Sequence, residues 1–268
     1  MIRVTVQGAA GRMGRMLVAQ VVQNEKMTLS GAVEITGSPF IGQDAGLVAG
    51  IQETGVKITD DLDMCLAMSD AVIAFTSPEA TMELVPKAAD DDVSMVIGTT
   101  GLSAEQKDTL KAFADKGAKI VFAPNMSVGV NLLFALCDKV ARLLGDDYDI
   151  EVVEMHHNQK KDAPSGTAAR LGEILCNARG LSYEKDTRHG RVGMPGARPK
   201  NEIGMHSLRG GDVVGDHTVI FATSGERIEL THKASSRETF AKGAVRAVLF
   251  LEDAKPGLYD MQDVLHLR

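Results

Sequence analysis

The first half of the chain alternates between two hydrophobic patterns. Ile2 to Gln7 alternates apolar and polar residues, which predicts a strand, and a glycine-rich turn from Gly8 to Gly14 follows it. Beyond the turn, apolar residues recur at helical spacing, and Met27 to Glu34 predicts a second strand. The pattern then repeats, with strands expected at 71–75, 94–97 and 119–123 and helices that begin at Pro78 and after Ser103.

Strands and helices that alternate with short loops predict a parallel sheet covered by helices on both faces. We therefore expect an α/β fold with a Rossmann-like doubly wound parallel sheet. Residues 35–55 carry several glycines and little periodicity, and we expect a surface loop there. Ligands of such sheets bind beyond the carboxyl ends of the strands. The residues that follow each strand are therefore the first candidates for function.

The second half begins with a long helix expected over 127–144 and a strand expected over 151–155. Ser165 can cap a helix that begins near Gly166. Residues 182–202 are charged, glycine-rich and irregular, and we expect a flexible lid or excursion there.

The end of the chain predicts a second sheet. Strands are expected at 203–208, 217–222 and 227–232, and a short turn joins the last two. Such strands indicate an α+β domain with a mostly antiparallel open sheet. An amphipathic helix over 240–251 is expected to return to the first domain. The predicted domains are therefore 1–126 with 237–268, and 127–236.

Composition narrows the classes of function. The chain has 268 residues, 44% of them hydrophobic, which is ordinary for a globular enzyme. A net charge of −7 with no basic block argues against nucleic-acid binding. No apolar run is long enough for a membrane helix, and the first residues lead directly into a strand, so we expect no signal peptide. Cys65, Cys137 and Cys176 fit neither a disulfide framework nor a zinc site, which favours a cytoplasmic location.

The first turn predicts dinucleotide binding. Gly8, Gly11 and Gly14 stand between a strand and a helix, where glycines let the backbone approach a pyrophosphate. Glu34 follows Gly14 by the roughly 20 residues expected of a carboxylate that accepts from a ribose hydroxyl. Residues 98–100 and 123–126 follow two other strands and are further candidates for cofactor contact. Turn chemistry alone explains the glycines well, but it explains the threonines and Asn125 less well.

A second candidate site lies between His156 and Thr167. Adjacent histidines on a strand face opposite sides, so His156 and His157 cannot meet one atom, and no third metal ligand is spaced to join them. Lys160 can supply a positive charge or a proton, and the helix start at Ser165 offers N–H donors to an anionic substrate. A solvated loop is the alternative. A serine nucleophile at Ser165 would need a third orienting group and an oxyanion site, and neither is identifiable.

The same residues carry a family resemblance. The signature Glu151-x-x-Glu154-x-His156-His157-x-x-Lys160-x-Asp162-x-Pro164-Ser165-Gly166-Thr167-Ala168 closely resembles that of bacterial dihydrodipicolinate reductases, the 4-hydroxy-tetrahydrodipicolinate reductases of lysine and diaminopimelate biosynthesis. The resemblance covers essentially the whole chain. It includes the Gly8–Gly14 turn and the segments 97–101, 125–131, 231–237 and 257–261.

The resemblance implies an oxidoreductase that passes a hydride from NADH or NADPH to a small dicarboxylate, with loss of a hydroxyl as water. It implies that His156 is the acid/base residue, that Lys160 is a proton donor, and that the substrate carboxylates are held by His157, Gly166 and Thr167; Ser165 joins them from the helix-start argument. It also implies a homotetramer formed through the second domain. The implied cofactor contacts are Gly8, Ala9, Ala10, Gly11, Arg12, Met13, Glu34, Gly98, Thr99, Thr100, Ala123, Pro124, Asn125 and Met126.

The sequence departs from the family pattern at two positions. Many relatives have an arginine directly after the acid, able to pair with the 2′-phosphate of NADPH, and Ile35 stands there. Ser77 replaces a second arginine often found before the Pro-Glu pair. Because Glu34 repels a 2′-phosphate, we expect NADH to be preferred, with Arg12 allowing some use of NADPH.

Two other classes of function remain as alternatives. The first is another two-domain reductase, such as an aspartate-semialdehyde or diaminopimelate dehydrogenase; the former needs a nucleophilic cysteine in an exposed loop, which the cysteine positions do not predict. The second is a nicotinamide-binding sensor or assembly protein without catalysis. Such a protein would have no reason to hold His156, Lys160 and Ser165 together.

Overall fold

The computed structural model describes residues 1–268, which form two compact units. Unit 1 comprises residues 1–128 and 238–268, and unit 2 comprises residues 129–237. The bounds expected from the sequence lie within two residues of these at each junction. No helix of the chain is both long and apolar enough to span a membrane.

Unit 1 is built on a parallel sheet, as the alternation of strands and helices predicts. The sheet runs β11-β5-β4-β3-β1-β2, and every neighbouring pair is parallel. The chain order reverses direction between β1 and β3, and the ends of these two strands are therefore where a ligand is expected. The strands are β1 (Ile2–Gln7), β2 (Met27–Val33), β3 (Ala71–Ala74), β4 (Ser94–Ile97), β5 (Lys119–Phe122) and β11 (Gly257–Tyr259).

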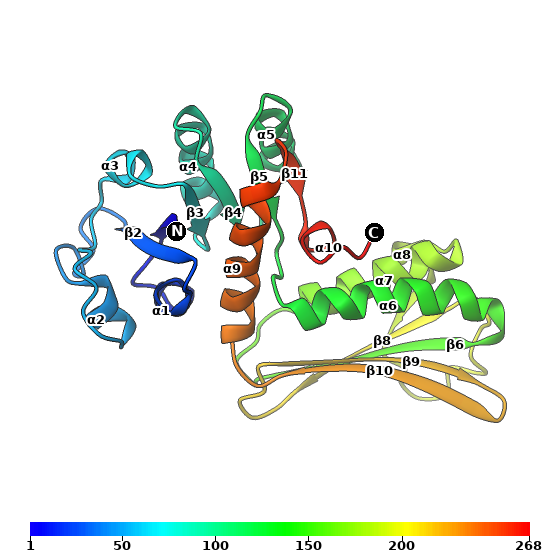
Figure 1. Ribbon diagram of the computed structural model, residues 1–268. Helices are drawn as coiled ribbons and strands as arrows, with labels where there is room; N and C mark the ends of the chain where they lie inside the picture. Colours follow the sequence, from blue (N-terminus) through cyan, green and yellow to red (C-terminus); the bar gives the residue numbers. More distant parts are fainter. The chain divides into compact units, whose positions relative to one another are not determined.

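Helices cover both faces of this sheet (Figure 1). Alternate strand residues enter opposite layers: Ile73 packs on the side of α1 and α9, whereas Val72 packs on the side of α3, α4 and α5. The helices are α1 (Arg12–Gln23), α2 (Ala45–Ala49), α3 (Leu62–Ala67), α4 (Pro78–Asp90), α5 (Ala104–Asp115), α9 (Glu238–Asp253) and α10 (Met261–Val264). Helix α2 lies inside the stretch 35–55 that was expected to be loop.

Unit 2 has a mixed sheet in the order β10-β9-β6-β8-β7. The pairings of β9 with β10 and with β6 are antiparallel, as expected, whereas β6–β8 and β7–β8 are parallel. The physical reason is the crossover helix α7, which returns the chain so that β8 runs in the direction of β6. The elements are α6 (Val128–Leu144), a 3₁₀ turn (Gly145–Asp147), β6 (Asp149–His156), α7 (Gly166–Arg179), α8 (Tyr183–Asp186), β7 (Thr187–His189), β8 (Ile203–Arg209), β9 (Gly215–Thr223) and β10 (Glu226–Ala234).

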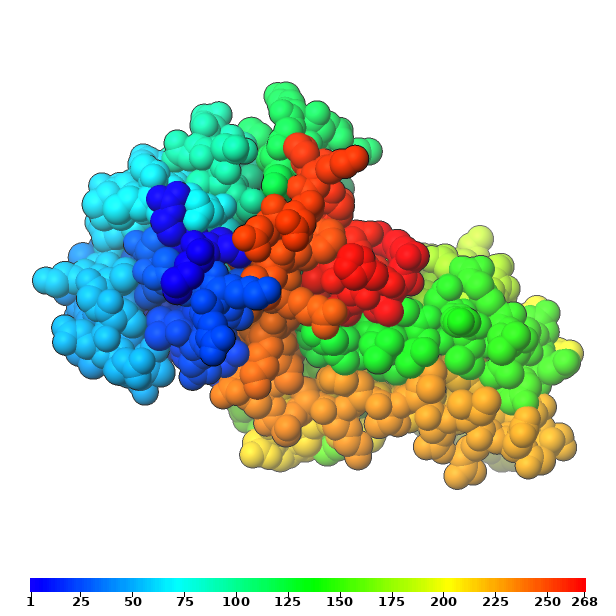
Figure 2. All heavy atoms as spheres, in the orientation of Figure 1, coloured from blue at the N-terminus to red at the C-terminus, as the bar shows by residue number.

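The two faces of this sheet differ. Helices α6 and α7 cover one face, and their apolar residues, among them Leu133, Leu171 and Leu175, form a core with Val152 and Phe221 (Figure 1). No helix covers the other face. Strand β10 runs along the edge of the unit, where Figure 2 shows it, in orange, open to solvent. Its charged residues suit an exposed sheet edge.

The excursion after α7 is tied to the helix-free face. The carboxylate of Glu151 accepts from Arg191 at 2.7 and 3.0 Å, from Arg198 at 2.9 Å and from His206 at 2.6 Å. These bonds hold the pKa of Glu151 at about 2, although burial alone would raise it. The sequence predicts a flexible lid or an excursion for residues 182–202, and the structure shows an excursion that Arg191 and Arg198 anchor to β6.

Candidate functional site

The predicted substrate segment of unit 2 runs from the end of β6 to the start of α7. Strand β6 ends at His156, and Ser165 caps α7 by accepting a hydrogen bond from the Ala168 N–H at 3.2 Å. The side chain at Gly166 would meet no atom within 4 Å, so the helix start is open to a ligand. The N-terminal end of a helix presents backbone N–H groups and the positive end of its dipole, so an anion can bind here.

Glu154 lies buried behind this segment and accepts from three different elements. Its Oε2 accepts from Nδ1 of His156 at 2.6 Å, and its Oε1 accepts from the backbone N–H of Ser165 at 3.1 Å. Arg209 on β8 donates to both oxygens, at 2.9 and 3.0 Å. Only 1% of the Glu154 side chain is exposed, so this carboxylate is compensated by hydrogen bonds rather than by water.

The pKa shifts of the pair follow from this geometry. Burial would raise the pKa of Glu154, but the hydrogen bonds from Arg209 and His156 outweigh it and hold the pKa below its ordinary value. Burial lowers the pKa of His156, and the bond to Glu154 offsets that only in part. Near neutral pH the carboxylate is therefore charged and the imidazole is largely neutral.

The second buried histidine, His217, lies beside the first. The two rings meet edge to face with centroids 5.2 Å apart, and Nε2 of His217 lies 3.1 Å from the Ser165 hydroxyl. Burial lowers the pKa of His217 to about 4, so it is neutral. Its Nδ1 is buried without a hydrogen-bond partner. A serine nucleophile at Ser165 therefore has a histidine but lacks the third orienting group, which is the element the sequence also failed to supply.

The remaining predicted substrate residues lie on the same loop and helix start. Lys160 donates to Asp162 at 2.8 Å, and its backbone N–H donates to the carbonyl of His157 at 3.1 Å. His156 is buried and His157 is half-exposed, in keeping with the expectation that the two face different surroundings. Thr167 follows Gly166 in the first turn of α7. All six predicted substrate-site residues thus belong to one short segment of unit 2.

The glycine-rich turn of unit 1 fits a dinucleotide. Gly8 has φ +75°, a conformation that other residues rarely adopt. A side chain at Gly14 would meet the carbonyl oxygen of Gly8 at 1.9 Å, so helix α1 packs directly on the turn. Gly11, the N-cap of α1, provides no side-chain cap. The N-terminal N–H groups of α1 therefore remain for a pyrophosphate.

Glu34 lies at the end of the second strand, as the sequence predicts. It follows β2 directly, and its Oε1 accepts from the backbone N–H of Ala10 at 2.8 Å, which joins it to the glycine-rich turn. Its other carboxylate oxygen has no protein donor and is free for a ribose diol. Ile35, next to it, is 79% exposed, and Arg12 at the start of α1 is exposed.

The other predicted cofactor residues lie after β4 and β5. The side chain of Thr99 is buried, and its hydroxyl already accepts from the Thr76 N–H and from Thr81. Ala123 and Met126 are also buried. These residues can therefore meet a cofactor only through their backbones, whereas Thr100 is exposed. A side chain at Gly98 would strike the ring of Phe75, which explains that glycine by packing.

Three site residues escaped the sequence reasoning. Glu154 stood inside the quoted signature but was given no role, and Arg209 and His217 come from β8 and β9, far away in the chain. The alternation of β6 places Glu154 and His156 on one face, which is the signal that could have paired them. Arg209 and His217 are brought in by strand register, as Glu154 lies opposite His217.

The cysteines do not contribute to a site. Cys65, Cys137 and Cys176 are free thiols and fully buried, and burial raises the pKa of Cys137 to about 12. An exposed nucleophilic cysteine, the requirement of an aspartate-semialdehyde dehydrogenase, is thus lacking. No group of three or more His, Cys, Asp or Glu side chains is placed to hold a metal ion.

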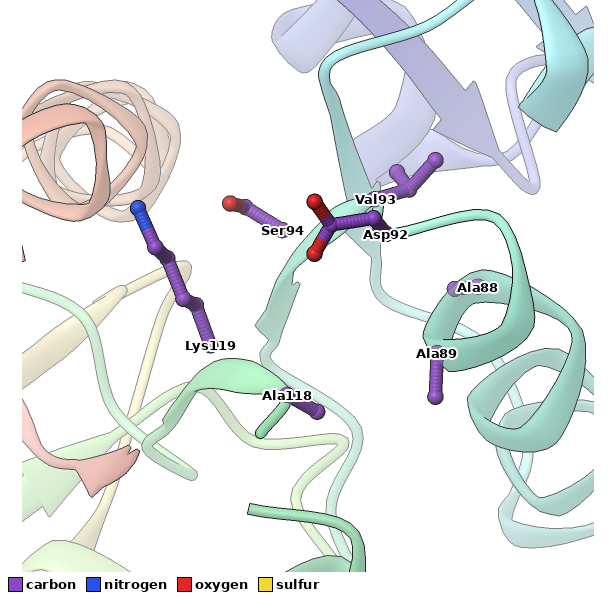
Figure 3. Close-up of a pocket in the computed structure, with 7 residues that line it drawn as sticks. All are labelled: Ala88, Ala89, Asp92, Val93, Ser94, Ala118 and Lys119. Carbon is purple, nitrogen blue, oxygen red and sulfur yellow. The ribbon is translucent and has the colours of Figure 1, made fainter. Parts of the chain in front are cut away.

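A small pocket in unit 1 lies away from these residues. It has a volume of about 10 Å³ and is lined by the end of α4 and the starts of β4 and β5, where Asp92, Ser94 and Lys119 supply the polar groups (Figure 3). A more open hollow of about 480 Å³ lies at the same edge, beside the Arg3–Asp70 ion pair. Both lie at the strand starts, opposite to the edge where parallel sheets bind ligands. The smaller one holds about one water molecule.

Comparison with known proteins gives the same family for both parts of the chain. Residues 2–126 match the family model described as dihydrodipicolinate reductase, N-terminus, and residues 129–265 match the one described as dihydrodipicolinate reductase, C-terminus. The 4-hydroxy-tetrahydrodipicolinate reductases of Hahella chejuensis and Syntrophotalea carbinolica are 53% and 51% identical to this chain over 268 residues, all of both chains. A solved structure of dihydrodipicolinate reductase with bound dipicolinate, from Paenisporosarcina sp. TG-14, is 25% identical with a TM-score of 0.76, covering 98% of each chain.

Proposed function

The chain belongs to the dihydrodipicolinate reductase family, and from this premise we propose how its residues carry out the family's reaction. The enzyme is an oxidoreductase of lysine and diaminopimelate biosynthesis, and it reduces 4-hydroxy-tetrahydrodipicolinate to tetrahydrodipicolinate with release of water. A reduced pyridine nucleotide, when bound, supplies the hydride. The observation that supports the residue assignment is the buried carboxylate of Glu154, which joins His156 to the start of α7.

The proton chemistry falls to Lys160 and His156. Loss of the substrate hydroxyl as water consumes a proton, and Lys160 carries an ammonium group that can donate it. Asp162, 2.8 Å from Nζ, holds that ammonium in place. His156 is neutral near pH 7 with Nδ1 engaged by Glu154, so Nε2 is the atom that exchanges protons with the substrate. We assign His156 as the acid/base residue and Lys160 as the proton donor.

The substrate carboxylates are assigned to the start of α7 and to His157. The N–H groups at Gly166 and Thr167 lie in the first turn of the helix, where an anion is stabilised by backbone donors and the helix dipole. Ser165 contributes by capping the helix, and its hydroxyl is held between Ala168 and His217. Dipicolinate, which the Paenisporosarcina enzyme binds, carries two carboxylates and suits such a site.

For the cofactor we propose NADH in preference to NADPH. Glu34 presents a free carboxylate oxygen at the glycine-rich turn, which accepts from a ribose hydroxyl and repels a phosphate. Neither Ile35 nor Ser77 can offset that repulsion, since Ile35 is apolar and the Ser77 hydroxyl caps α4. Comparing kcat/KM for the two cofactors tests this, and a clear advantage of NADPH would refute it.

We further propose a homotetramer in the cytoplasm. The helix-free face of the unit 2 sheet supports the assembly, because Val153, Met155 and Ile220 lie on it only partly buried. The three buried free thiols support a reducing compartment. Sedimentation of the purified protein tests the assembly, and a monomer at micromolar concentration would contradict it.

The reaction itself is tested with fresh substrate. Pyruvate and aspartate semialdehyde are condensed enzymatically, the product is added to the protein with NADH, and loss of NADH absorbance is followed. Oxidation that depends on both the product and the protein is expected. Clear NADH binding without oxidation of NADH would instead favour a nicotinamide-binding sensor.

A further inference from the structure

The carboxylate of Glu154 is saturated by donors in a way that only a carboxylate permits. Each oxygen accepts from Arg209, and further donors are His156 at Oε2, the Ser165 N–H at Oε1 and the Ser207 hydroxyl. A glutamine at this position would have an NH₂ group in place of one carboxylate oxygen, and its two N–H bonds would face groups that are themselves donors. The hydrogen bonds at this position therefore require an ionised carboxylate. Because the position is buried, a donor left without an acceptor there would not be compensated by water.

This arrangement decides which ring nitrogen of His156 is protonated. A charged carboxylate at Oε2 accepts, so the facing Nδ1 carries the hydrogen and Nε2 keeps its lone pair. Nε2 has no protein partner and lies beside the backbone of Gly215, where a side chain would come within 3.0 Å of it. The nitrogen that faces away from Glu154 is thus the one left for the substrate.

The same carboxylate fixes the start of α7. Ser165 is the residue whose N–H is held at Oε1, and it is also the cap of the helix that offers Gly166 and Thr167. Arg209 adds a bond to the carbonyl of Asp162 at 2.6 Å and so secures the loop between the two. One buried side chain therefore sets the position of the acid/base histidine and of the helix start together.

We propose that Glu154 is a positioning residue that holds His156 in its Nδ1–H tautomer and aligns it with the anion-binding start of α7. Glu154 does not touch the substrate and acts through His156 and Ser165. The groups that face His156 are Glu154 on its own strand, Lys160 on the loop, Arg209 on β8 and His217 on β9. The inference rests on the proposed function for its effect on turnover, but not for its effect on the tautomer.

Two substitutions at this carboxylate give opposite shifts. Glu154→Gln removes the negative charge that favours imidazolium, so the pKa of His156 falls and both tautomers become populated. Arg209→Met removes a positive charge and leaves Glu154 to His156, so the pKa of His156 rises. Imidazole nitrogen NMR shifts of His156, assigned with His156→Gln, report the tautomer and the titration in the ligand-free protein. A general loss of structure would not lower the pKa of His156 in one variant and raise it in the other.

Turnover is measured on the same variants. Glu154→Gln is expected to lower kcat by ~10²–10⁴-fold, the range found when an orienting carboxylate or a positioned proton donor is lost. Glu154→Asp keeps the charge and should recover part of the loss. Glu151→Gln is the matched control, since it neutralises an equally well-bonded carboxylate on the other face of β6 and should leave the His156 tautomer and pKa unchanged.

The outcomes separate the two proposals. Retention of the Nδ1–H tautomer and an unshifted pKa in Glu154→Gln would overturn the positioning role, as would equal shifts in Glu151→Gln. If Glu154→Gln does not fold, Arg209→Met alone decides the direction, and a fall in the pKa of His156 there contradicts the proposal. If the wild-type protein shows the expected tautomer yet oxidises no NADH with the condensation product, the proposed function fails while the positioning role stands.

Discussion

His156 and Lys160 are the residues on which the proposed chemistry depends most directly. Each lies at the end of β6 or on the loop that follows, in unit 2, whereas the predicted cofactor residues belong to unit 1. We expect His156→Gln and Lys160→Ala each to lower kcat by ~10²–10⁴-fold, because a positioned proton donor is lost. NADH affinity, measured by fluorescence titration, should stay near the wild-type value. The exposed histidine variant His189→Gln is the control, and ordinary turnover in both site variants would refute the role assignment.

The proposed preference for NADH also depends on single residues. Ile35 is 79% exposed and adjoins Glu34, so Ile35→Arg costs no core packing and places a guanidinium next to the carboxylate. We expect this substitution to raise kcat/KM for NADPH by up to about fivefold, since an exposed charge pair contributes up to about 1 kcal/mol. Activity with NADH should change little. Ile41→Arg, at another exposed apolar position of unit 1, is the control.

The grouping of the candidate site residues could be predicted where they are close in the sequence. It could not be predicted where strand register brings distant residues together. His156, Lys160 and Ser165 fall within a few positions of one another, so the pattern alone brought them together. Glu154 carried a visible signal in the alternation of its strand, but no signal showed that its oxygens would meet Arg209. His217 reaches Ser165 across 52 positions through the pairing of β6 with β9, which no local pattern specifies.

At the scale of elements, helix caps and strand patterns were predicted well and sheet direction less so. Ser103 and Ser165 cap their helices, and Pro78 stands in the first turn of α4, as their local chemistry requires. Strands β6, β8, β9 and β10 of unit 2 were expected, whereas β7 lies in the stretch expected to be irregular, and the parallel pairing of β6 with β8 was not expected. Whether two strands are parallel depends on which strands become neighbours in the sheet. For β6 and β8 this is determined by the packing of α7 on the sheet, which no local pattern specifies.

The cap of α7 allows a prediction with a close control. Ser165→Ala removes the acceptor for the Ala168 N–H and the contact with His217, and should cost about 1 kcal/mol of unfolding free energy. Ser103→Ala removes the equivalent cap of α5, where Gln106 is the donor, and should cost a similar amount. Only Ser165→Ala is expected to weaken dipicolinate binding, measured by calorimetry. Equal affinity in both variants would show that Ser165 has no part in the substrate site.

At the scale of the whole molecule, the strongest pKa shifts are not spread evenly. The pKa of Glu151 falls to about 2 and that of His217 to about 4, and both residues belong to unit 2. Each group favours the folded state only in one protonation state, so acid acts on this unit more than on unit 1. The site and the acid-sensitive groups share the same sheet, and stability and activity should therefore be lost together as the pH falls.

His217 provides the sharpest test of that expectation. Its pKa is lowered in the folded state, from the ordinary 6.5 to about 4, so its contribution is present above pH 6.5 and lost as the pH falls toward 4. A shift of this size corresponds to about 3 kcal/mol at about 1.4 kcal/mol per pKa unit. Between pH 6.5 and 4, unfolding of unit 2 should take up about one proton fewer in His217→Leu than in the wild type. The unfolding free energy of the variant should therefore depend less steeply on pH. The measurement is urea unfolding at several pH values, followed by amide exchange of β6 and α7. His189→Gln should keep the wild-type slope, and an unchanged slope in His217→Leu would show that burial of this imidazole does not govern acid stability.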